Sequence, residues 1–260
     1  MERREILAKL TQNEDEKLLL GRIWDKYDQC RSRNIPSATA FLSPQEQMLA
    51  RRLLQKLGEE RAVFYGGYEG AERCRLCFLP DWQEEAAEEL VCAVRATFYE
   101  KGALTHRDVL GALMGQQITR ESVGDLLVSP DHIDVLVSDT VADFLVQNWD
   151  SAGRVALKTE RIPLSEVEVP AQQVKEIRDT VATLRLDAVL ASGFSLSRGR
   201  AAEAIEAGRV QLNWQLCQKT DAHIAEGDVL TVRGLGKCKV AEVGNQTRKG
   251  RIFLTLLRYL

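Results

Sequence analysis

Apolar residues recur at helical intervals through the first part of the chain. The stretches with this period are Ile6–Leu10, Leu18–Tyr27 and Met48–Leu57. Ser43 and Pro44 predict the start of the third helix, because serine is a common N-cap and proline fits the first helical position. Gly58 predicts its end. We therefore expect residues 1 to about 60 to form a layer of helices.

The pattern then changes to short β-rich runs. AVFYGGY and RCRLCFLP, between residues 62 and 80, predict a hairpin. Six elements follow, with strands over 91–99, 124–128, 133–137 and 154–158 and helices over 107–114 and 140–149. This βαββαβ order is typical of a split βαβ module of the ferredoxin or RRM type. A short helix is expected over 82–89, although EEAAEEL also favours one helix continuing to Ala96.

Residues 185–213 predict two short helices and a strand. Ala201, Ala204, Ile205 and Gly208 follow the helical period, so Ser197 predicts the N-cap of the second helix and Gly208 its end. The remaining alternation predicts a strand over 210–216, a hairpin over 227–243 that turns at Gly234 and Gly236, and a last strand over 251–257. Residues 162–170 predict a connector, and 172–183 a helix leading into Arg185.

Together these elements predict an α+β chain of several modules, which a length of 260 residues with 45% hydrophobic content can support. We expect a mostly helical N-terminal region ending in a β-hairpin (1–82), an RRM-like middle module (83–165), a linker and helix (166–182), and a small domain of two helices plus strands (183–260).

Charge is distributed unevenly along the chain. The overall net charge is -3, but residues 183–260 hold 12 Lys and Arg against 7 Asp and Glu, a charge of +5, which leaves -8 for the remainder. Arg198 and Arg200 fall in the first turn of a predicted helix, where positive charge opposes the helix dipole. A phosphate backbone beside them would offset that cost. The C-terminal module therefore predicts a nucleic-acid partner.

The same module resembles the S4-type RNA-binding domain. The residues that carry the resemblance are Arg185-Leu186-Asp187, Leu190, Phe194, Ser197-Arg198, Ala201, Ile205, Gly208, Val210, Asn213 and Gly227-Asp228 before VLTV. The resemblance implies that the face formed by the two helices binds structured RNA. The positions that match this basic face are Arg185, Ser197, Arg198, Arg200, Arg209 and Lys219.

Upstream motifs extend the resemblance to the bacterial YlmH-type RNA-binding proteins. They are Gly66-Gly67-Tyr68, Ala71-Glu72-Arg73, LTHRDVLGALMG over 104–115, Arg120-Glu121 and Gly124-Asp125. Gln116-Gln117 departs from the Leu-Gly pair expected there. This resemblance implies a ribosome-associated protein that acts on large subunits holding a stalled peptidyl-tRNA during quality control. Our leading hypothesis is a protein without enzymatic activity that binds structured ribosomal RNA, with tRNA as a further candidate partner.

Base recognition by the middle module stays open at this point. RNA recognition by an RRM depends on aromatic residues of the central strands, and here Phe98 and Tyr99 fall in one strand while 133–137 has no aromatic residue. The module either binds RNA by another face or is structural. Lys237, Lys239, Arg248, Lys249 and Arg251 likewise either extend the basic face or are solvated charges at strand edges.

Other chemistry finds little support in the sequence. Cys74 and Cys77 form one close pair, whereas a structural zinc site needs four ligands, so we expect no metal and no cofactor. The N-terminus mixes both charge signs and lacks the apolar core of a signal peptide. No apolar run is long enough for a membrane-spanning helix. Six scattered cysteines are typical of a protein in a reducing compartment. These features predict a cytoplasmic protein without a membrane partner.

Two other functions remain as alternatives. S4-type modules also accompany pseudouridine synthases, and an RNA-modifying enzyme would need a catalytic carboxylate, for which the candidates are Asp125, Asp131 and Asp134. The acidic first 180 residues could instead make the chain a protein-binding adaptor, for instance in cell division. The RNA-binding hypothesis would fail if the arginines pointed to different sides or were neutralised by carboxylates of the chain itself.

Overall fold

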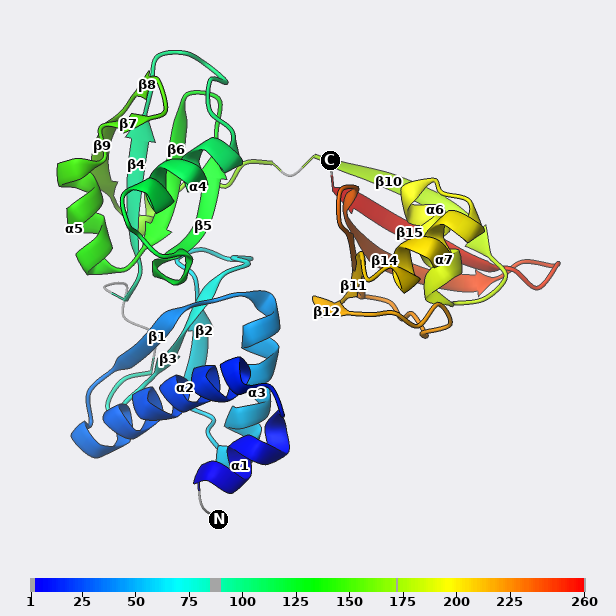
Figure 1. Cartoon of the computed structure of the whole chain (residues 1–260), viewed down its shortest axis with the longest axis horizontal. Coiled ribbons are helices and arrows are strands. Elements are labelled where there is room, and N and C mark those ends of the chain that lie inside the picture. The colour runs from blue at the N-terminus through cyan, green and yellow to red at the C-terminus, as the bar shows by residue number, and fades with distance from the viewer. Residues whose placement is uncertain (1–2, 85–89, 172, 260) are drawn as a thin grey trace. The chain divides into compact units, whose positions relative to one another are not determined.

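The computed structural model describes residues 3–84, 90–171 and 173–259. The chain forms two compact units, Met1–Pro170 and Ala171–Leu260, each with its own hydrophobic core (Figure 1). Most of the helix expected over 82–89 lies in residues 85–89, outside the described residues.

Helices and a small sheet form the first part of unit 1. The elements are α1 (Arg3–Leu10), α2 (Glu14–Arg33), β1 (Ser37–Leu42), α3 (Pro44–Leu57), β2 (Ala62–Tyr65) and β3 (Cys74–Phe78), with strand order β1-β3-β2. Ser43 and Glu46 form a capping box at the start of α3, as the sequence predicts for Ser43. The expectation of helices alone was wrong at β1, because this strand pairs with β3, a segment far along the chain.

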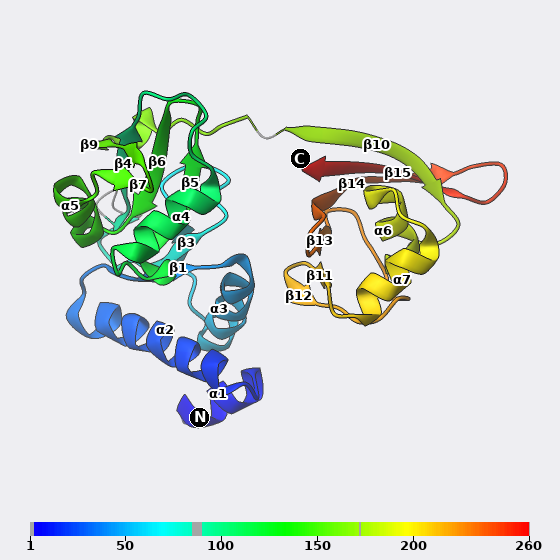
Figure 2. The same cartoon turned by 45° about the horizontal axis from the view of Figure 1, so that its top comes forward.

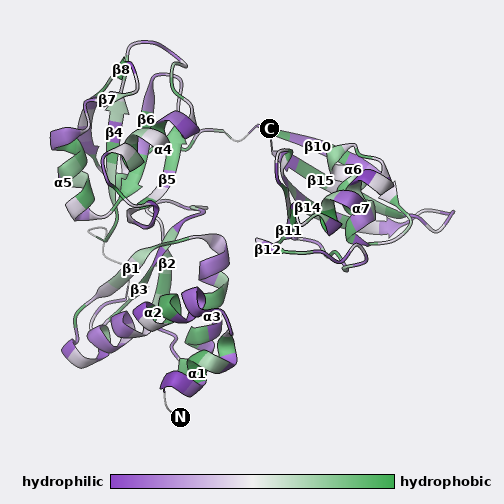
Figure 3. Ribbon diagram, in the orientation of Figure 1, coloured by the Kyte–Doolittle hydropathy of each residue, from purple (hydrophilic) through white to green (hydrophobic). Residues whose placement is uncertain are grey.

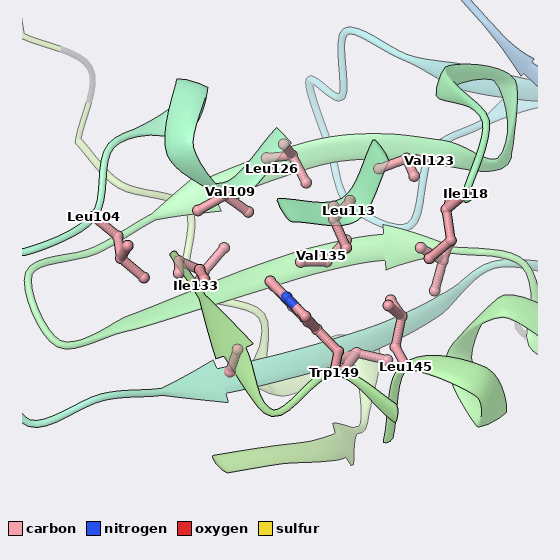
Figure 4. Close-up of a cluster of buried hydrophobic side chains, with 14 of the residues drawn as sticks. Leu104, Val109, Leu113, Ile118, Val123, Leu126, Ile133, Val135, Leu145 and Trp149 are labelled. Carbon is pink, nitrogen blue, oxygen red and sulfur yellow. The ribbon is translucent and has the colours of Figure 1, made fainter. Parts of the chain in front are cut away.

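The middle of unit 1 is a split βαβ module. Its elements are β4 (Cys92–Thr97), α4 (His106–Gly115), β5 (Val123–Val128), β6 (His132–Val137), α5 (Asp139–Asn148) and β9 (Lys158–Ile162), with the antiparallel order β5-β6-β4-β9. Both helices pack on one face of the sheet, and Figure 4 shows Val109, Leu113, Leu145 and Trp149 in that core. A 3-10 turn, η2 (Arg120–Ser122), precedes β5. The predicted fold is confirmed.

The fourth strand of this module was predicted too early. Residues 154–158 were expected to form it, but Ser151–Ala152 (β7) and Val155–Ala156 (β8) make a small hairpin, which turns at Gly153 with φ +63°. The ladder to β4 uses Lys158–Ile162 instead. Val155 and Leu157 pack against the core, which produces the strand-like alternation although residues 155–157 do not pair with β4.

The face of the sheet opposite the helices is covered within unit 1. Leu127 and Leu136 pack there against Phe41 of β1 and against the partly buried Tyr65 and Tyr68. A short 3-10 turn, η3 (Leu164–Glu166), lies over the same face through Leu164. This is the face on which an RRM stacks bases, so much of it is used for packing in this chain.

Unit 2 packs two helices on a six-stranded antiparallel sheet (Figures 1 and 2). The elements are β10 (Val174–Val181), α6 (Leu186–Phe194), α7 (Arg198–Glu206), β11 (Val210–Leu212), β12 (Gln215–Leu216), β13 (Val229–Val232), β14 (Gly236–Gln246) and β15 (Ile252–Tyr259), in the sheet order β10-β15-β14-β13-β11-β12. The two helices, the hairpin at Gly234–Gly236 and the last strand lie where the sequence predicts them.

Two expectations in unit 2 were wrong. The helix expected over 172–183 is strand β10, which pairs with β15 along its whole length. Val174, Ile177 and Val181 have helical spacing, but the ladder to a strand about 75 residues later decides the conformation. The single strand over 210–216 is two short strands, because Asn213 and Trp214 both adopt positive φ in a two-residue turn.

Candidate nucleic-acid interface

The α6–α7 corner positions the predicted binding residues. α6 begins after Arg185, whose backbone pairs with His223, and the amide of Asp187 donates to the carbonyl of Thr220 at 3.0 Å. Ser195 ends α6 in the left-handed conformation, with φ 54°. The chain then turns directly into α7, where Ser197 Oγ accepts a hydrogen bond from the Arg200 amide at 3.2 Å. The cap thereby fixes the first turn of α7 directly after the end of α6.

One carboxylate joins the two helices at this corner. Arg185 donates from Nε and Nη2 to the two oxygens of Asp187 at 3.2 Å each, and Arg198 Nη2 lies 3.3 Å from Asp187 Oδ2. Asp187 is 9% exposed, whereas Arg198 is 57% exposed. Burial opposes ionisation of Asp187, but the hydrogen bond from Arg185 and the charge of Arg198 outweigh it, so the pKa of Asp187 is lowered. The hydrogen bond to Asp187 raises the pKa of Arg185.

This cluster keeps an excess of positive charge. Among the three groups joined by these ion pairs, Asp187 supplies one negative charge to two guanidinium groups, which leaves a net +1. The charge of Asp221 also acts on Arg185, but without an ion pair. The distances of 3.2 to 3.4 Å exceed the roughly 2.8 Å typical of strong charge-assisted bonds, so Asp187 orients the two arginines without saturating them. The arginines therefore lie on one side of the corner and are only partly neutralised.

The remaining predicted residues are exposed around α7. Within the described part of the chain, Arg200, Arg209 and Lys219 make no ion pair. Lys219 lies between two contacts: Gln218 donates to the carbonyl of Glu206 at 3.2 Å, and the next residue, Thr220, accepts from α6. Arg209 follows the C-terminal end of α7, a nine-residue helix about 13 Å long, so it is separated from Arg198 along the helix.

Two contributors to this surface were missed in the sequence. In the sequence Asp187 stands only as part of the Arg185-Leu186-Asp187 motif, although a carboxylate two residues after an arginine can indicate an ion pair. The exposed Arg233 lies beside Arg209, because its amide donates to the Arg209 carbonyl at 2.9 Å. No local pattern indicates that second contact, since it depends on the pairing of β11 with β13.

In unit 1, two of the three candidate catalytic carboxylates are engaged in structural contacts. Asp134 is fully buried and binds Arg95 through two bonds of 2.7 Å. Asp125 accepts from Tyr68 Oη at 2.8 Å and from the amides of Glu72 and Arg73 at 2.7 and 3.1 Å. Asp125 thus ties the β2–β3 loop to β5. The third, Asp131, is half-exposed and pairs with the adjacent His132 at 2.8 Å.

The motif around Asp125 acts as a joint between the two parts of unit 1. The guanidinium of Arg73 donates to the carbonyls of Phe41, Arg120 and Val123. Arg120 donates in turn to Val123 and Gly124, and burial lowers its pKa to about 10. These contacts hold the two parts of unit 1 together.

The structure also places the two close cysteines, Cys74 and Cys77, and the two aromatic residues of the predicted strand, Phe98 and Tyr99. Cys74 and Cys77 are buried in β3, and burial raises their pKa values to about 11 and 12. Among the described residues, no group of three His, Cys, Asp or Glu side chains is arranged to hold a metal. Phe98 is packed in the core, while Tyr99 is fully exposed. The described helices are all too short or too polar to cross a membrane.

Comparisons with known proteins agree with the sequence motifs. Three family models match: "YlmH, N-terminal" over residues 16–81, "Putative RNA-binding domain in YlmH" over 96–166, and "S4 domain" over 184–230. The Bacillus subtilis (strain 168) "Ribosome-associated protein quality control protein P2" is 35% identical over 223 residues, covering 85% of this chain and 86% of that protein. The chain belongs to the YlmH family.

The resemblance seen in the sequence is thereby confirmed, including the S4 domain of this YlmH-family chain. A solved structure, "Cell division protein ylmH from Streptococcus pneumoniae", is 19% identical with a TM-score of 0.49, covering 60% of this chain and 96% of that one. At Gln117, where the family motif is expected to carry glycine, the backbone still adopts the left-handed conformation with φ 62°.

Proposed function

We propose that this YlmH-family protein binds structured ribosomal RNA on the large ribosomal subunit through the α6–α7 corner of its S4 domain, in the cytoplasm. The contacting residues are Arg185, Ser197, Arg198, Arg200, Arg209 and Lys219. Arginine and lysine would contact phosphates, and Ser197 would fix the start of α7. Such a surface recognises the shape of folded RNA and not its base sequence, because its contacts are to phosphates.

The observation that carries the proposal is the shared carboxylate of Asp187. It holds Arg185 and Arg198 on one side of the corner with a net positive charge, in a domain whose residues 183–260 carry +5. A helix start that places Arg198 and Arg200 against its own dipole is unfavourable in isolation. Bound phosphate would offset this cost.

The step served by this binding is proposed from the relative's name. The relative is named as a ribosome-associated protein of quality control. We extend this to large subunits that hold a stalled peptidyl-tRNA, and that tRNA is therefore among the proposed RNA partners. The proposed role is binding rather than catalysis. It is supported by the structural engagement of Asp125 and Asp134, two of the carboxylates that an RNA-modifying reaction could have used.

A salt titration with charge-matched variants tests the binding surface. The variant Arg198→Ala/Arg200→Ala is compared with Arg33→Ala/Arg52→Ala, which removes the same charge from exposed positions of unit 1 that lie outside the matched RNA-binding domains. Each lost phosphate contact lowers the slope of log affinity against log salt by roughly 0.7 to 0.9, so the first variant should lose about 1.5 in slope and the control nothing. Equal slopes for the two variants would rule out the α6–α7 corner.

A separate assay tests the proposed absence of catalysis. The protein is incubated with purified ribosomal RNA, and the nucleosides are then analysed by mass spectrometry. We expect the nucleoside composition to be unchanged, and any new modified nucleoside would contradict the proposal.

A further inference from the structure

The β14–β15 hairpin carries a basic tip at the end of unit 2. Residues 247–251 read Thr-Arg-Lys-Gly-Arg, and the side chains of Arg248 and Lys249 are exposed. The tip projects beyond the sheet in both views of Figures 1 and 2, and it is coloured hydrophilic in Figure 3. It lies outside the residues that the S4 family model matches.

The tip is an ordered turn. The Thr247 amide donates to the Arg251 carbonyl at 2.6 Å, and the Arg251 amide donates to Thr247 Oγ1 at 3.0 Å. Gly250 supplies the positive φ, 75°, that closes the turn. Below the tip, the guanidinium of Arg251 donates to Oγ1 and to the carbonyl of Thr180, at the end of β10. Arg248 and Lys249 are therefore presented from a fixed base.

A hollow connects this hairpin with the α6–α7 corner. It has a volume of about 270 Å³, and its lining includes both Arg198 of α7 and Arg251 of the hairpin. Asp179 is the one carboxylate among the described lining residues, and its oxygens already accept hydrogen bonds from Ser192 Oγ and from the Thr180 amide, each at 2.7 Å. Two arginines thus flank a hollow whose acidic group is already engaged.

We propose that the hairpin tip is a second phosphate-binding arm, and that the RNA backbone crosses the hollow between Arg198 and Arg251 to reach Arg248 and Lys249. The ligand is the phosphodiester backbone of folded RNA, contacted without reading of bases. This inference rests on the proposed function of the α6–α7 corner and extends its footprint beyond the S4 helices. Continuity with that corner favours RNA over an acidic protein as the occupant.

The test compares three full-length variants for binding to large ribosomal subunits at several salt concentrations. Arg248→Ala/Lys249→Ala removes the tip charges but keeps Arg251, which supports the turn. Lys175→Ala/Arg178→Ala is the matched control, because it removes two charges from exposed positions of β10. The third variant is Arg198→Ala/Arg200→Ala. Unchanged melting temperatures verify that each variant is folded.

We expect the tip variant to lose about tenfold in affinity and about 1.5 in salt slope, and the β10 control to match the wild type. A tip variant that binds as the wild type does, while the α7 variant is weakened, would overturn this inference and leave the proposed function standing. If neither the tip nor the α7 variant is weakened, both fail. If the tip variant loses affinity for intact subunits but not for their deproteinised RNA, the arm binds a ribosomal protein and the inference is wrong.

Discussion

The buried pair of Asp134 and Arg95 gives a prediction whose size follows from the structure. Asp134 on β6 is fully buried, binds Arg95 of β4 through two bonds of 2.7 Å, and accepts from the Glu168 amide at 2.9 Å. Asp134→Ala would leave the largely buried guanidinium without its main partner and the Glu168 amide without an acceptor. Breaking a buried pair from one side costs about 3 to 5 kcal/mol of unfolding free energy.

That cost converts to a large thermal shift. For a unit of the size of Met1–Pro170, each kcal/mol lowers the melting temperature by roughly 2 to 4 °C, so we expect a loss on the order of 10 °C. Glu168 is exposed and lies 3.5 Å from Arg95, so it can compensate only in part. Tryptophan fluorescence suits the assay, because Trp24, Trp82 and Trp149 all belong to unit 1.

Two further variants separate the pair from a general effect of charge. Asp25→Ala removes one partner of the exposed pair with Arg3 and should cost less than about 1 kcal/mol. The double variant Asp134→Ala/Arg95→Met should recover much of the stability, because replacing both charges with apolar groups is often nearly neutral. Unfolding of Asp134→Ala at the wild-type temperature would refute this reasoning and return Asp134 to the candidate catalytic groups.

Three more predictions follow from single sites. Gly124→Ala should lower the unfolding free energy of unit 1 by about 1 to 3 kcal/mol in urea unfolding, because the added Cβ would lie 2.7 Å from the Phe41 ring. An unchanged unfolding midpoint would show that the Phe41 ring shifts without cost. The pKa of Asp187 is lower when folded than when unfolded, so its stabilisation is present above about pH 4 and lost as pH falls through the folded pKa. The difference in unfolding free energy between the wild type and Asp187→Asn should therefore decrease as the pH falls from 6 to 3. A difference that increases over this range would contradict a lowered pKa of Asp187. Burial raises the pKa of Cys77 to about 12, so iodoacetamide at pH 8 should label it only after denaturation, as peptide mass spectrometry would show.

Local patterns determined much of this protein. The period of apolar residues placed α2, α3, α4, α5, α6 and α7, and Ser43 and Ser197 were read correctly as caps because a cap is a local arrangement. The order of strands and helices was enough to specify the split βαβ module. Formal charge alone indicated the basic domain, because residues 183–260 are positive and the remainder of the chain is negative.

Tertiary pairing decided the rest. β1 forms by pairing with β3, and β10 forms by pairing with β15. These partners are distant in sequence, so a local pattern does not indicate either strand. Asp125 and Asp134 are candidate catalytic carboxylates in the sequence, and only the fold supplies Tyr68 and Arg95 as their partners. The sequence by itself therefore determined most of the helices, the order of the middle module, the family and the charge of the C-terminal domain. The fold decided which charges are neutralised and which face outward, because that depends on contacts between residues far apart in the chain.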